Sequence, residues 1–328
     1  MQRRYLIALC GACLLSASVA RAQARKVRIG FLAGSSPDPS LLRNAVEPFR
    51  EALRGLGYVE GQNLELHLRF AEGQPDRLPG LAAKLLALKP DILVTMGPRP
   101  ARVVQAATTS LPVVAAAVDD PVAMGLIADF TRPGGNITGI SSFGGELVAK
   151  RLQLLKEFVP SIERIGVLQN PVTAESTRAN LENALNKWGQ ALGVRIVLVD
   201  ASTPDQFEPA FDELRRERVQ GVLVFADATF GRHQARLHEL VAKHRLPSIW
   251  GHRDYLPGGG LASYQSDFPA IFRNAASMVD RILKGAKPAV TPFEQATKLD
   301  LVINMKTAQA LGLTVPQSLL LAADDLIR

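Results

Sequence analysis

Short apolar strands alternate with helix-length amphipathic segments from near the start of this chain. Strands are predicted at 26–31, 64–70 and 92–96, and the first two are followed by helical patterns at 41–56 and 76–88. Strands that alternate with helices of about ten to fifteen residues indicate βαβ units. We therefore expect the first part of the chain to form a parallel sheet with helices on both faces.

The alternation restarts after a turn-rich stretch at 134–142. Further strands are predicted at 162–168, 194–199 and 221–225, again separated by helical patterns. The chain has 328 residues, of which 47% are hydrophobic, and this is enough apolar material for two cores. The sequence therefore predicts an α/β protein of two doubly wound lobes in tandem.

The last part of the chain fits neither series on its own. Its pattern predicts a strand at 260–264, a long helix at 267–284 and a short strand at 299–303. Extra elements after the second series indicate that the chain passes between the lobes more than once.

The N-terminus has the order of features typical of an export signal. Arg3 and Arg4 precede an apolar run at 5–19, and Ala-Arg-Ala at 20–22 offers a small-residue cleavage site. The apolar run is too short for a comfortable membrane span. We predict a cleaved signal peptide at 1–22 and a periplasmic location.

Both cysteines, Cys10 and Cys13, lie in this signal. We therefore expect the mature chain to have no disulfide, no thiol nucleophile and no cysteine metal site. A lipid anchor on Cys13 is an alternative for this segment. The formal net charge of +7 includes the arginines of the signal and is spread along the chain, so it does not indicate a nucleic-acid partner.

The strand ends supply the candidate ligand-binding residues, because ligands bind beyond the carboxyl ends of strands in open parallel sheets. Small, hydroxylated, amide and acidic residues stand there beside apolar and aromatic ones, and this mixture suits a small polar molecule held between two lobes. The same residue types also serve as turn and helix-cap residues, which is an equally good reading for any single one. The candidates, including two serines of the joining stretch and a tyrosine of the tail, are Ser35, Ser36, Met96, Gly97, Asp119, Asp120, Ser141, Ser142, Asn170, Phe225, Asp227, Trp250 and Tyr264.

Sequence signals of catalysis and of cofactors are missing. No G-x-G-x-x-G follows the first strand, and neither G-x-x-x-x-G-K-[ST] nor G-x-S-x-G occurs. The histidines His233, His238 and His244 do not share a helix face, so they do not indicate a metal site. We expect no enzyme activity, no cofactor and no metal ion. His252 follows a predicted strand and is expected either near the space between the lobes or in a surface turn.

Several sequence motifs stand in order along the chain after the signal. They are GLGYVEGQN (55–63), AEGQPDRLP (71–79), DPVAMGLI (120–127), RPGGNITGIS (132–141), KRLQLLKE (150–157), GGGLASY (258–264), ILKGAKP (282–288) and LVINMKTAQALGLTVP (301–316). Through these motifs the chain resembles the ABC transporter substrate-binding proteins of the tryptophan/tyrosine-binding type. The resemblance covers essentially the whole chain after the signal.

The resemblance implies a type I periplasmic-binding fold, in which three crossovers join the lobes and a ligand binds in the cleft. It implies an N-terminal lobe of 23–138 and 262–298, and a C-terminal lobe of 139–261 and 299–328. It also implies that Asp119 and Asp120 end the last strand before the first crossover.

The function implied by the resemblance is that of an exported solute-binding protein of an ABC importer. Such a protein would bind a small solute, an amino acid or an aromatic compound, and would act as a monomer with an ABC permease in the membrane. A periplasmic ligand sensor for a membrane receptor is the alternative on the same fold. An enzyme of two nucleotide-binding lobes, such as a glycosyltransferase, is disfavoured by the export signal and by the missing nucleotide motifs.

Under this interpretation the polar candidates have distinct roles. Ser35 and Ser36 would donate hydrogen bonds to the solute, and Asp119 or Asp227 would pair with an ammonium group. Main-chain amides near Gly97 would bind a carboxylate, because the start of a helix favours negative charge.

Main-chain amides near Asn170 would do the same from the second lobe. The aromatic candidates, Phe225, Trp250 and Tyr264, would stack on an apolar or aromatic part of the solute. The sequence alone does not name the solute.

Overall fold

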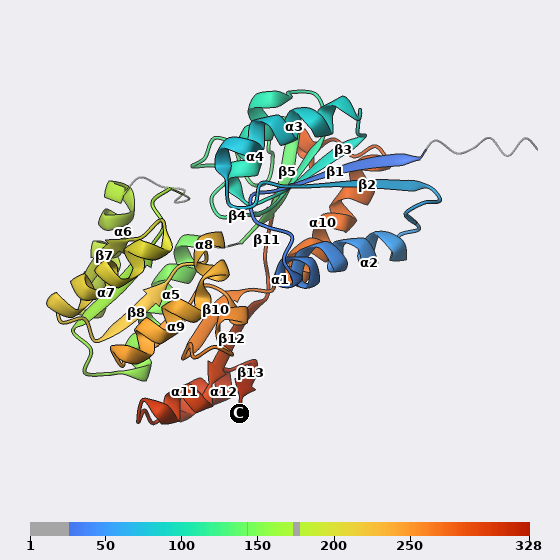
Figure 1. The fold of residues 1–328 in the computed structure, drawn as a ribbon. Coiled ribbons are helices and arrows are strands. Elements are labelled where there is room, and N and C mark those ends of the chain that lie inside the picture. The colour runs from blue at the N-terminus through green and yellow to red at the C-terminus, as the bar shows by residue number, and fades with distance from the viewer. Residues whose placement is uncertain (1–25, 143, 173–177) are drawn as a thin grey trace, which may run out of the picture.

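The computed structural model of the chain describes residues 26–142, 144–172 and 178–328, and these form two α/β lobes side by side (Figure 1). Residues 1–25 lie outside the described part, and with them the expected signal peptide, Cys10 and Cys13. Within the described part, no helix combines the length and the apolar character needed to cross a bilayer.

The first lobe is built on a six-stranded sheet of order β11-β5-β4-β3-β1-β2, in which every pairing is parallel. In sheet order its strands are β11 (Glu294–Gln295), β5 (Ile137–Ser141), β4 (Val113–Val118), β3 (Ile92–Met96), β1 (Val27–Ala33) and β2 (Leu64–Phe70). Its helices are α1 (Pro39–Leu41), the π-helical η1 (Leu42–Val46), α2 (Glu47–Gly55), the short η2 (Pro75–Arg77), α3 (Leu78–Ala87), α4 (Pro98–Ala107), α10 (Phe268–Leu283) and η5 (Pro288–Val290).

The second lobe has a seven-stranded sheet of order β13-β12-β10-β9-β8-β6-β7, parallel except where β10 meets β12. In sheet order its strands are β13 (Asp325–Ile327), β12 (Leu299–Asn304), β10 (Ala262–Ser266), β9 (Ser248–Trp250), β8 (Gly221–Val224), β6 (Arg164–Gln169) and β7 (Arg195–Asp200). Its helices are α5 (Gly144–Phe158), α6 (Arg178–Leu192), η3 (Pro204–Gln206), α7 (Phe207–Arg216), α8 (Ala228–Arg232), α9 (Gln234–Lys243), η4 (Arg253–Tyr255), α11 (Met305–Ala310) and α12 (Gln317–Ala322).

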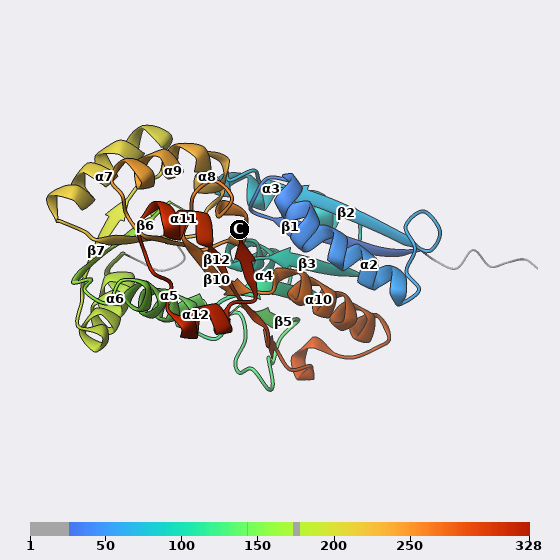
Figure 2. The same cartoon turned by 90° about the horizontal axis from the view of Figure 1, so that it is seen from below.

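Each sheet is covered by helices on both faces. The central strands β3 and β4 are continuous apolar runs that are buried almost throughout, as expected where both faces of a parallel sheet are covered. In the first lobe α2 and α10 share one core, and α3 and α4 share the core of the other face. Figure 2 shows α2 and α10 side by side, although more than two hundred residues separate them in the sequence.

Three segments carry the chain between the lobes, as the resemblance implied: from β5 into α5, from β10 into α10, and from β11 into β12. The third passage runs from the end of β11 to the start of β12, and the boundary predicted there is 298/299. The first expected boundary, 138/139, falls inside β5, and the second, 261/262, comes just before β10, which pairs with β9 and β12 of the second lobe. The lobe to which a strand belongs is decided by the strands with which it pairs, and the sequence of one strand does not identify those partners.

The three connecting segments are joined to one another by hydrogen bonds. Between the first and second segments, the Ser266 hydroxyl donates to the Ser142 carbonyl oxygen at 2.7 Å. Between the first and third, the Ala296 amide donates to the Ser141 carbonyl oxygen at 2.9 Å. Between the second and third, the Asp267 amide donates to the Lys298 carbonyl oxygen at 3.0 Å. These bonds tie the three connecting segments together, and we call this connection the three-stranded hinge.

Candidate functional site

The carboxyl ends of the two sheets lie toward each other, and contacts join the loops that follow them. Arg232, in the helix after β8, donates to the Ser36 hydroxyl at 3.0 Å and to the Glu72 carbonyl oxygen at 3.2 Å in the first lobe. Arg99, at the start of α4, donates to the Val172 carbonyl oxygen in the second lobe. The space expected to bind a ligand is therefore bordered by direct contacts between the lobes.

Asp254 makes a further contact between the lobes. Its Oδ2 atom accepts hydrogen bonds from the Ser40 hydroxyl, from Asn44 Nδ2 at 3.2 Å and from Arg43 Nη2 at 3.3 Å. Ser40 belongs to α1 and both Arg43 and Asn44 to η1 of the first lobe, whereas Asp254 follows β9 of the second. We call Asp254 and these three donors the Asp254 latch.

His252 lies beside this latch. Its ring faces Phe268 of α10 with 5.8 Å between centroids, so it bridges the second lobe to the first. Burial lowers the pKa of His252; the Asp254 and Asp38 carboxylates raise it, and the Arg253 and Arg151 guanidiniums lower it. The expected position near the space between the lobes is the one that the structure has.

Ser35 and Ser36 follow β1 as predicted, and their hydroxyls differ. The Ser35 Oγ atom is buried and forms no hydrogen bond within the described residues, whereas Ser36 accepts from Arg232. A buried hydroxyl without a partner has a desolvation cost that a ligand can offset. Ser35 therefore stays a candidate for hydrogen bonding to the solute.

Gly97 follows Met96, the last residue of β3, and is the N-cap of α4 with a φ of 84°, a conformation that favours glycine. Its amide already donates to the Ala116 carbonyl oxygen at 2.8 Å. Pro98 and Pro100 have no amide hydrogen, so the first turn of α4 has few free donors. The expected carboxylate site at this helix start is therefore poorly supplied with donors.

Asp119 lies at the hinge because β4 contains a bulge. The register of β4 against β5 shifts between Ala116 and Val118, and Ala117 between them has a φ of 57°. Past the bulge, the Asp119 carboxylate accepts from the Ser142 hydroxyl.

The neighbours of Asp119 divide between hinge and surface. The buried Ser141 donates to the Asp119 main-chain carbonyl oxygen at 2.9 Å. Asp120 is exposed and caps the following turn through the Ala123 amide at 2.9 Å. Ser141, Ser142 and Asp119 thus belong together at the hinge, whereas the contacts of Asp120 are those of a turn residue.

Asn170 and Asp227 lie together in the second lobe. Asn170 Nδ2 donates to Asp227 Oδ1 at 3.2 Å, and the same carboxylate oxygen caps α8 through the Thr229 amide at 2.8 Å. The half-buried Phe225 beside them packs on the core under α5. Because Asp227 already has several donors, Asp119 is the better placed carboxylate for an ammonium group.

Trp250 and Tyr264, which were both predicted to stack on the solute, differ in burial. The Trp250 side chain is 0% exposed and is packed between His238 and Tyr255, with Nε1 bonded to the Ser248 hydroxyl at 2.9 Å. The Trp250 ring is therefore part of the second lobe's interior, and the stacking hypothesis is wrong for it. Tyr264 is only half-buried and packs against the core that α5 covers. Burial and the Asp324 carboxylate raise the pKa of its phenol and the Arg151 guanidinium lowers it, so Tyr264 stays a candidate for stacking on the solute.

Arg151 was not among the candidates, although a signal for it exists. It stands on the buried stripe of α5, with Leu147 one turn before it and Leu155 one turn after it. Its side chain donates from Nε to the Tyr264 carbonyl oxygen at 2.7 Å and from Nη2 to the Gly251 carbonyl oxygen at 3.4 Å. A cationic side chain among the buried apolar positions of a helix is unusual, and this position is the sequence signal that indicates Arg151 as a further candidate.

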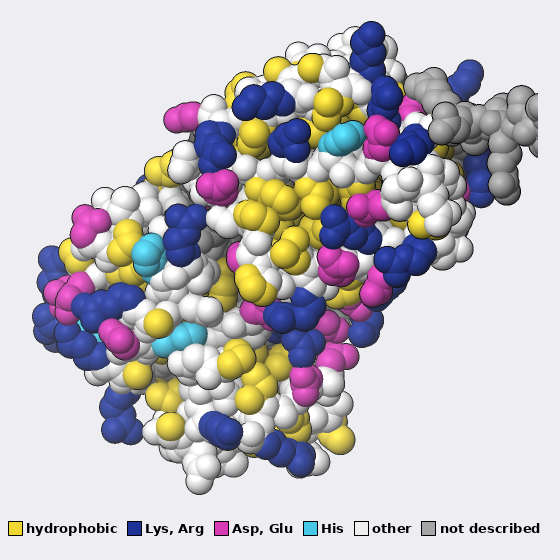
Figure 3. Space-filling model, turned by 45° about the vertical axis from the view of Figure 1, so that its right-hand side comes forward, with side chains coloured by type: hydrophobic (Ala, Val, Ile, Leu, Met, Phe, Trp, Pro, Cys, Tyr) yellow, Lys and Arg dark blue, Asp and Glu magenta, His cyan; other side chains and the backbone are white. Residues whose placement is uncertain are grey.

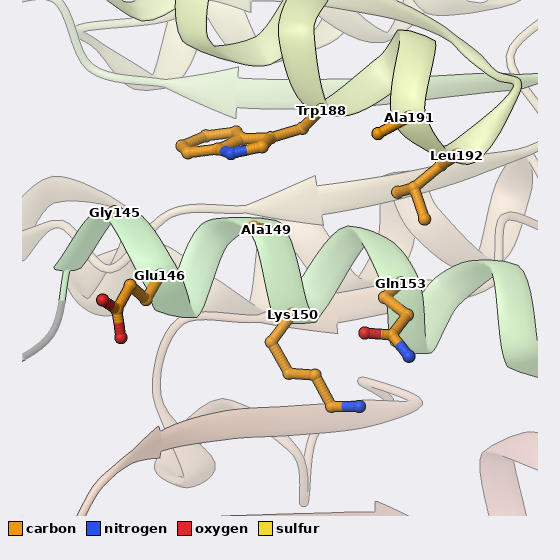
Figure 4. Close-up of a pocket in the computed structure, with 8 residues that line it drawn as sticks. All are labelled: Gly145, Glu146, Ala149, Lys150, Gln153, Trp188, Ala191 and Leu192. Carbon is orange, nitrogen blue, oxygen red and sulfur yellow. The ribbon is translucent and has the colours of Figure 1, made fainter.

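A cavity of about 590 Å³ lies on the outer side of the second lobe, between α5 and α6. Figure 4 shows the Trp188 ring above it, with Lys150 and Glu146 on α5 across from the ring. Helix faces form this groove and no strand end reaches it. We therefore do not assign the solute site to it.

A smaller cavity, of about 290 Å³, lies at the first turns of α3 and α4 and includes Arg99, which reaches the second lobe. Within the described ranges, no group of three or more His, Cys, Asp or Glu side chains is arranged to hold a metal ion. Figure 3 shows basic and acidic side chains interspersed over the face that it draws. This mixture gives that face no basic stripe of the kind that binds nucleic acid.

Comparison with known proteins assigns the fold and a family. A profile of the family described as "ABC transporter substrate binding protein" matches residues 37–327. The curated "Tyrosine-binding protein" of Clostridioides difficile (strain R20291) is 24% identical over 272 residues, which cover 83% of this chain and 77% of that protein.

Two solved structures are similar over 92% of this chain and 100% of their own. One is a conserved domain protein from Vibrio cholerae, with a TM-score of 0.83 and 27% identity. The other is an ABC domain from Streptococcus pneumoniae in complex with L-Trp, with a TM-score of 0.80 and 26% identity. The two lobes and their mostly parallel sheets are those of the type I periplasmic-binding fold.

Proposed function

Because the chain belongs to the ABC transporter substrate-binding protein family, we propose that it binds an amino acid with an aromatic side chain and delivers it to an ABC importer. One relative is named for tyrosine binding, and a structural neighbour was solved with L-Trp. The observation that carries the proposal is the meeting of the two sets of strand ends through Ser36, Arg232 and Asp254. Ligands of two-lobed proteins bind at such a place.

We further propose that the protein acts in the periplasm, where it closes on its solute and presents the closed form to a membrane permease. The three-stranded hinge permits a change in the lobe arrangement, and the Asp254 latch exists only when the lobes are together. A solute drives closure only as far as it binds the closed form better than the open one. Ser35, Asp119, Asn170 and Phe225 are the residues proposed to contact it.

A thermal-shift experiment on the exported, processed protein tests this function. L-Tryptophan, L-tyrosine and L-phenylalanine are the probes, with L-leucine and a sugar alcohol as comparisons. A ligand at about 100 times its dissociation constant adds about 2.7 kcal/mol to the free energy of unfolding, which is a readily measured shift. Stabilisation by an aromatic amino acid is the expected result, and no shift with any of the three would contradict the proposal.

A further inference from the structure

Arg151 is a buried cation that forms no ion pair with an Asp or Glu within the described part of the chain. Its residue is only 8% exposed. Its hydrogen bonds within the described part of the chain come from Nε and Nη2 and end on main-chain carbonyl oxygens. Burying an ionised group without a counter-ion is costly, and a ligand that supplies the counter-ion offsets this cost.

The surroundings of Arg151 place it at the solute space. Gly251, which accepts from Nη2, directly follows β9 and so lies at the edge of the second sheet that faces the first lobe. Burial lowers the pKa of Arg151 to about 10, and the Asp119 carboxylate, from the first lobe, is the largest opposing influence on it. The group is thus charged at neutral pH and lies near the hinge.

We propose that Arg151 binds the carboxylate of the solute, with Asp119 on the opposite lobe binding its ammonium group. The two side chains offer one positive and one negative group that no ion pair joins, which is the complement of an α-amino acid. The guanidinium presents a planar fork of donors that suits a carboxylate. This inference rests on the proposed function and specifies how the same site recognises its solute.

A purely structural role for Arg151, tying α5 to β9 and β10, makes a different prediction. Such a role would affect every ligand equally, whereas a carboxylate contact affects only ligands that have one. Tryptophan and tryptamine differ by this group alone, as do tyrosine and tyramine. The comparison within each pair therefore separates the two roles.

The experiment is calorimetric titration of the whole exported protein and of its Arg151→Gln variant with both pairs. We expect the substitution to weaken tryptophan or tyrosine binding by about 100-fold and to leave the amines unchanged, because loss of one member of a buried charge pair costs this much. Lys150→Gln removes the same charge from the neighbouring position of α5, on the side of the outer groove, and should change neither.

Two further measurements cover a failure of the glutamine variant to fold. Arg151→Lys keeps the charge and loses the fork, so it should retain a part of the preference for the acid. The unaltered protein should bind tryptophan about 100-fold more tightly than tryptophan amide. Equal losses for acid and amine, or equal binding of acid and amide, would overturn the inference while leaving the proposed function intact; no binding of any probe by the unaltered protein would overturn both.

Discussion

Removal of the Asp254 carboxylate should shift the protein toward its open form. In the Asp254→Ala variant the Ser40 hydroxyl, Asn44 Nδ2 and Arg43 Nη2 all lose their shared acceptor across the lobes. The open form does not have these contacts, so it should keep its stability. The substitution therefore acts on the difference between the two forms.

The size of the effect follows from the exposure of the donors. The Arg43 side chain is 67% exposed, so its ion pair adds little. Ser40 and Asn44 are half-buried, and a hydrogen bond to a charged acceptor is worth about 1.5–3 kcal/mol when buried. Taking the two near the lower limit, closure should weaken by about 2–3 kcal/mol, which is about 30- to 150-fold in the closing equilibrium.

The assay combines calorimetric titration with tryptophan or tyrosine and small-angle X-ray scattering with and without the ligand. When the free protein is mostly open, the apparent dissociation constant should rise by the same factor as closure weakens. Asp325→Ala is the matched control, because it removes a neighbouring ion pair to Arg253, 2.6 Å long, within the second lobe. Unchanged affinity and scattering in Asp254→Ala, or an equal loss in Asp325→Ala, would refute the reasoning.

Three other predictions follow from single contacts. Gly139→Ala should lower the free energy of unfolding by about 3 kcal/mol or more, because its Cβ would lie 1.9 Å from the Ala115 carbonyl oxygen, whereas Gly135→Ala meets no atom within 4 Å and should melt like the unaltered protein. Solute affinity, measured by calorimetric titration at several pH values, should fall as the pH drops below about 6.5. Burial in the closed form lowers the pKa of His252, so protonation favours the open form, in which the ring is exposed. His252→Gln should flatten this pH profile. Trp250→Ala should cost about 3–5 kcal/mol in chemical denaturation without changing which amino acid is preferred, and a changed preference would return the ring to the ligand site.

Local sequence determined the lobes better than the boundaries between them. The alternating strands and helices predicted both sheets, because burial on two faces gives strands such as β4 a recognisable apolar run. The boundaries were misplaced by a few residues at β5 and β10, because membership of a sheet depends on a strand's neighbours, and those neighbours are distant in sequence.

The candidate site was predicted as a set of strand ends, and the contacts of its individual residues were less predictable. Ser35, Ser36 and Asn170 lie where parallel-sheet geometry puts them. Trp250 follows the same rule of position, yet its ring turns into the core, because the direction of a side chain depends on the packing of α9 and η4 around it. Arg151 lies on a helix, whereas the strand-end rule considers only residues that follow strands. Only its position among the buried apolar residues of α5 indicates that its side chain lies inside the protein.

The contacts between the lobes and the buried Arg151 contribute in different ways to the free energy of closure. The Asp254 latch and the Arg232 contact lie in partly exposed positions, so together they contribute no more than a few kcal/mol to closure. Contacts of this size leave the open and closed forms close in free energy, so a solute can decide between them. Closure around a ligand without a carboxylate leaves the Arg151 charge buried and uncompensated, and this cost opposes closure. The same residue would therefore recognise the acid group and make closure conditional on it, so that a protein with weak contacts between its lobes still closes selectively.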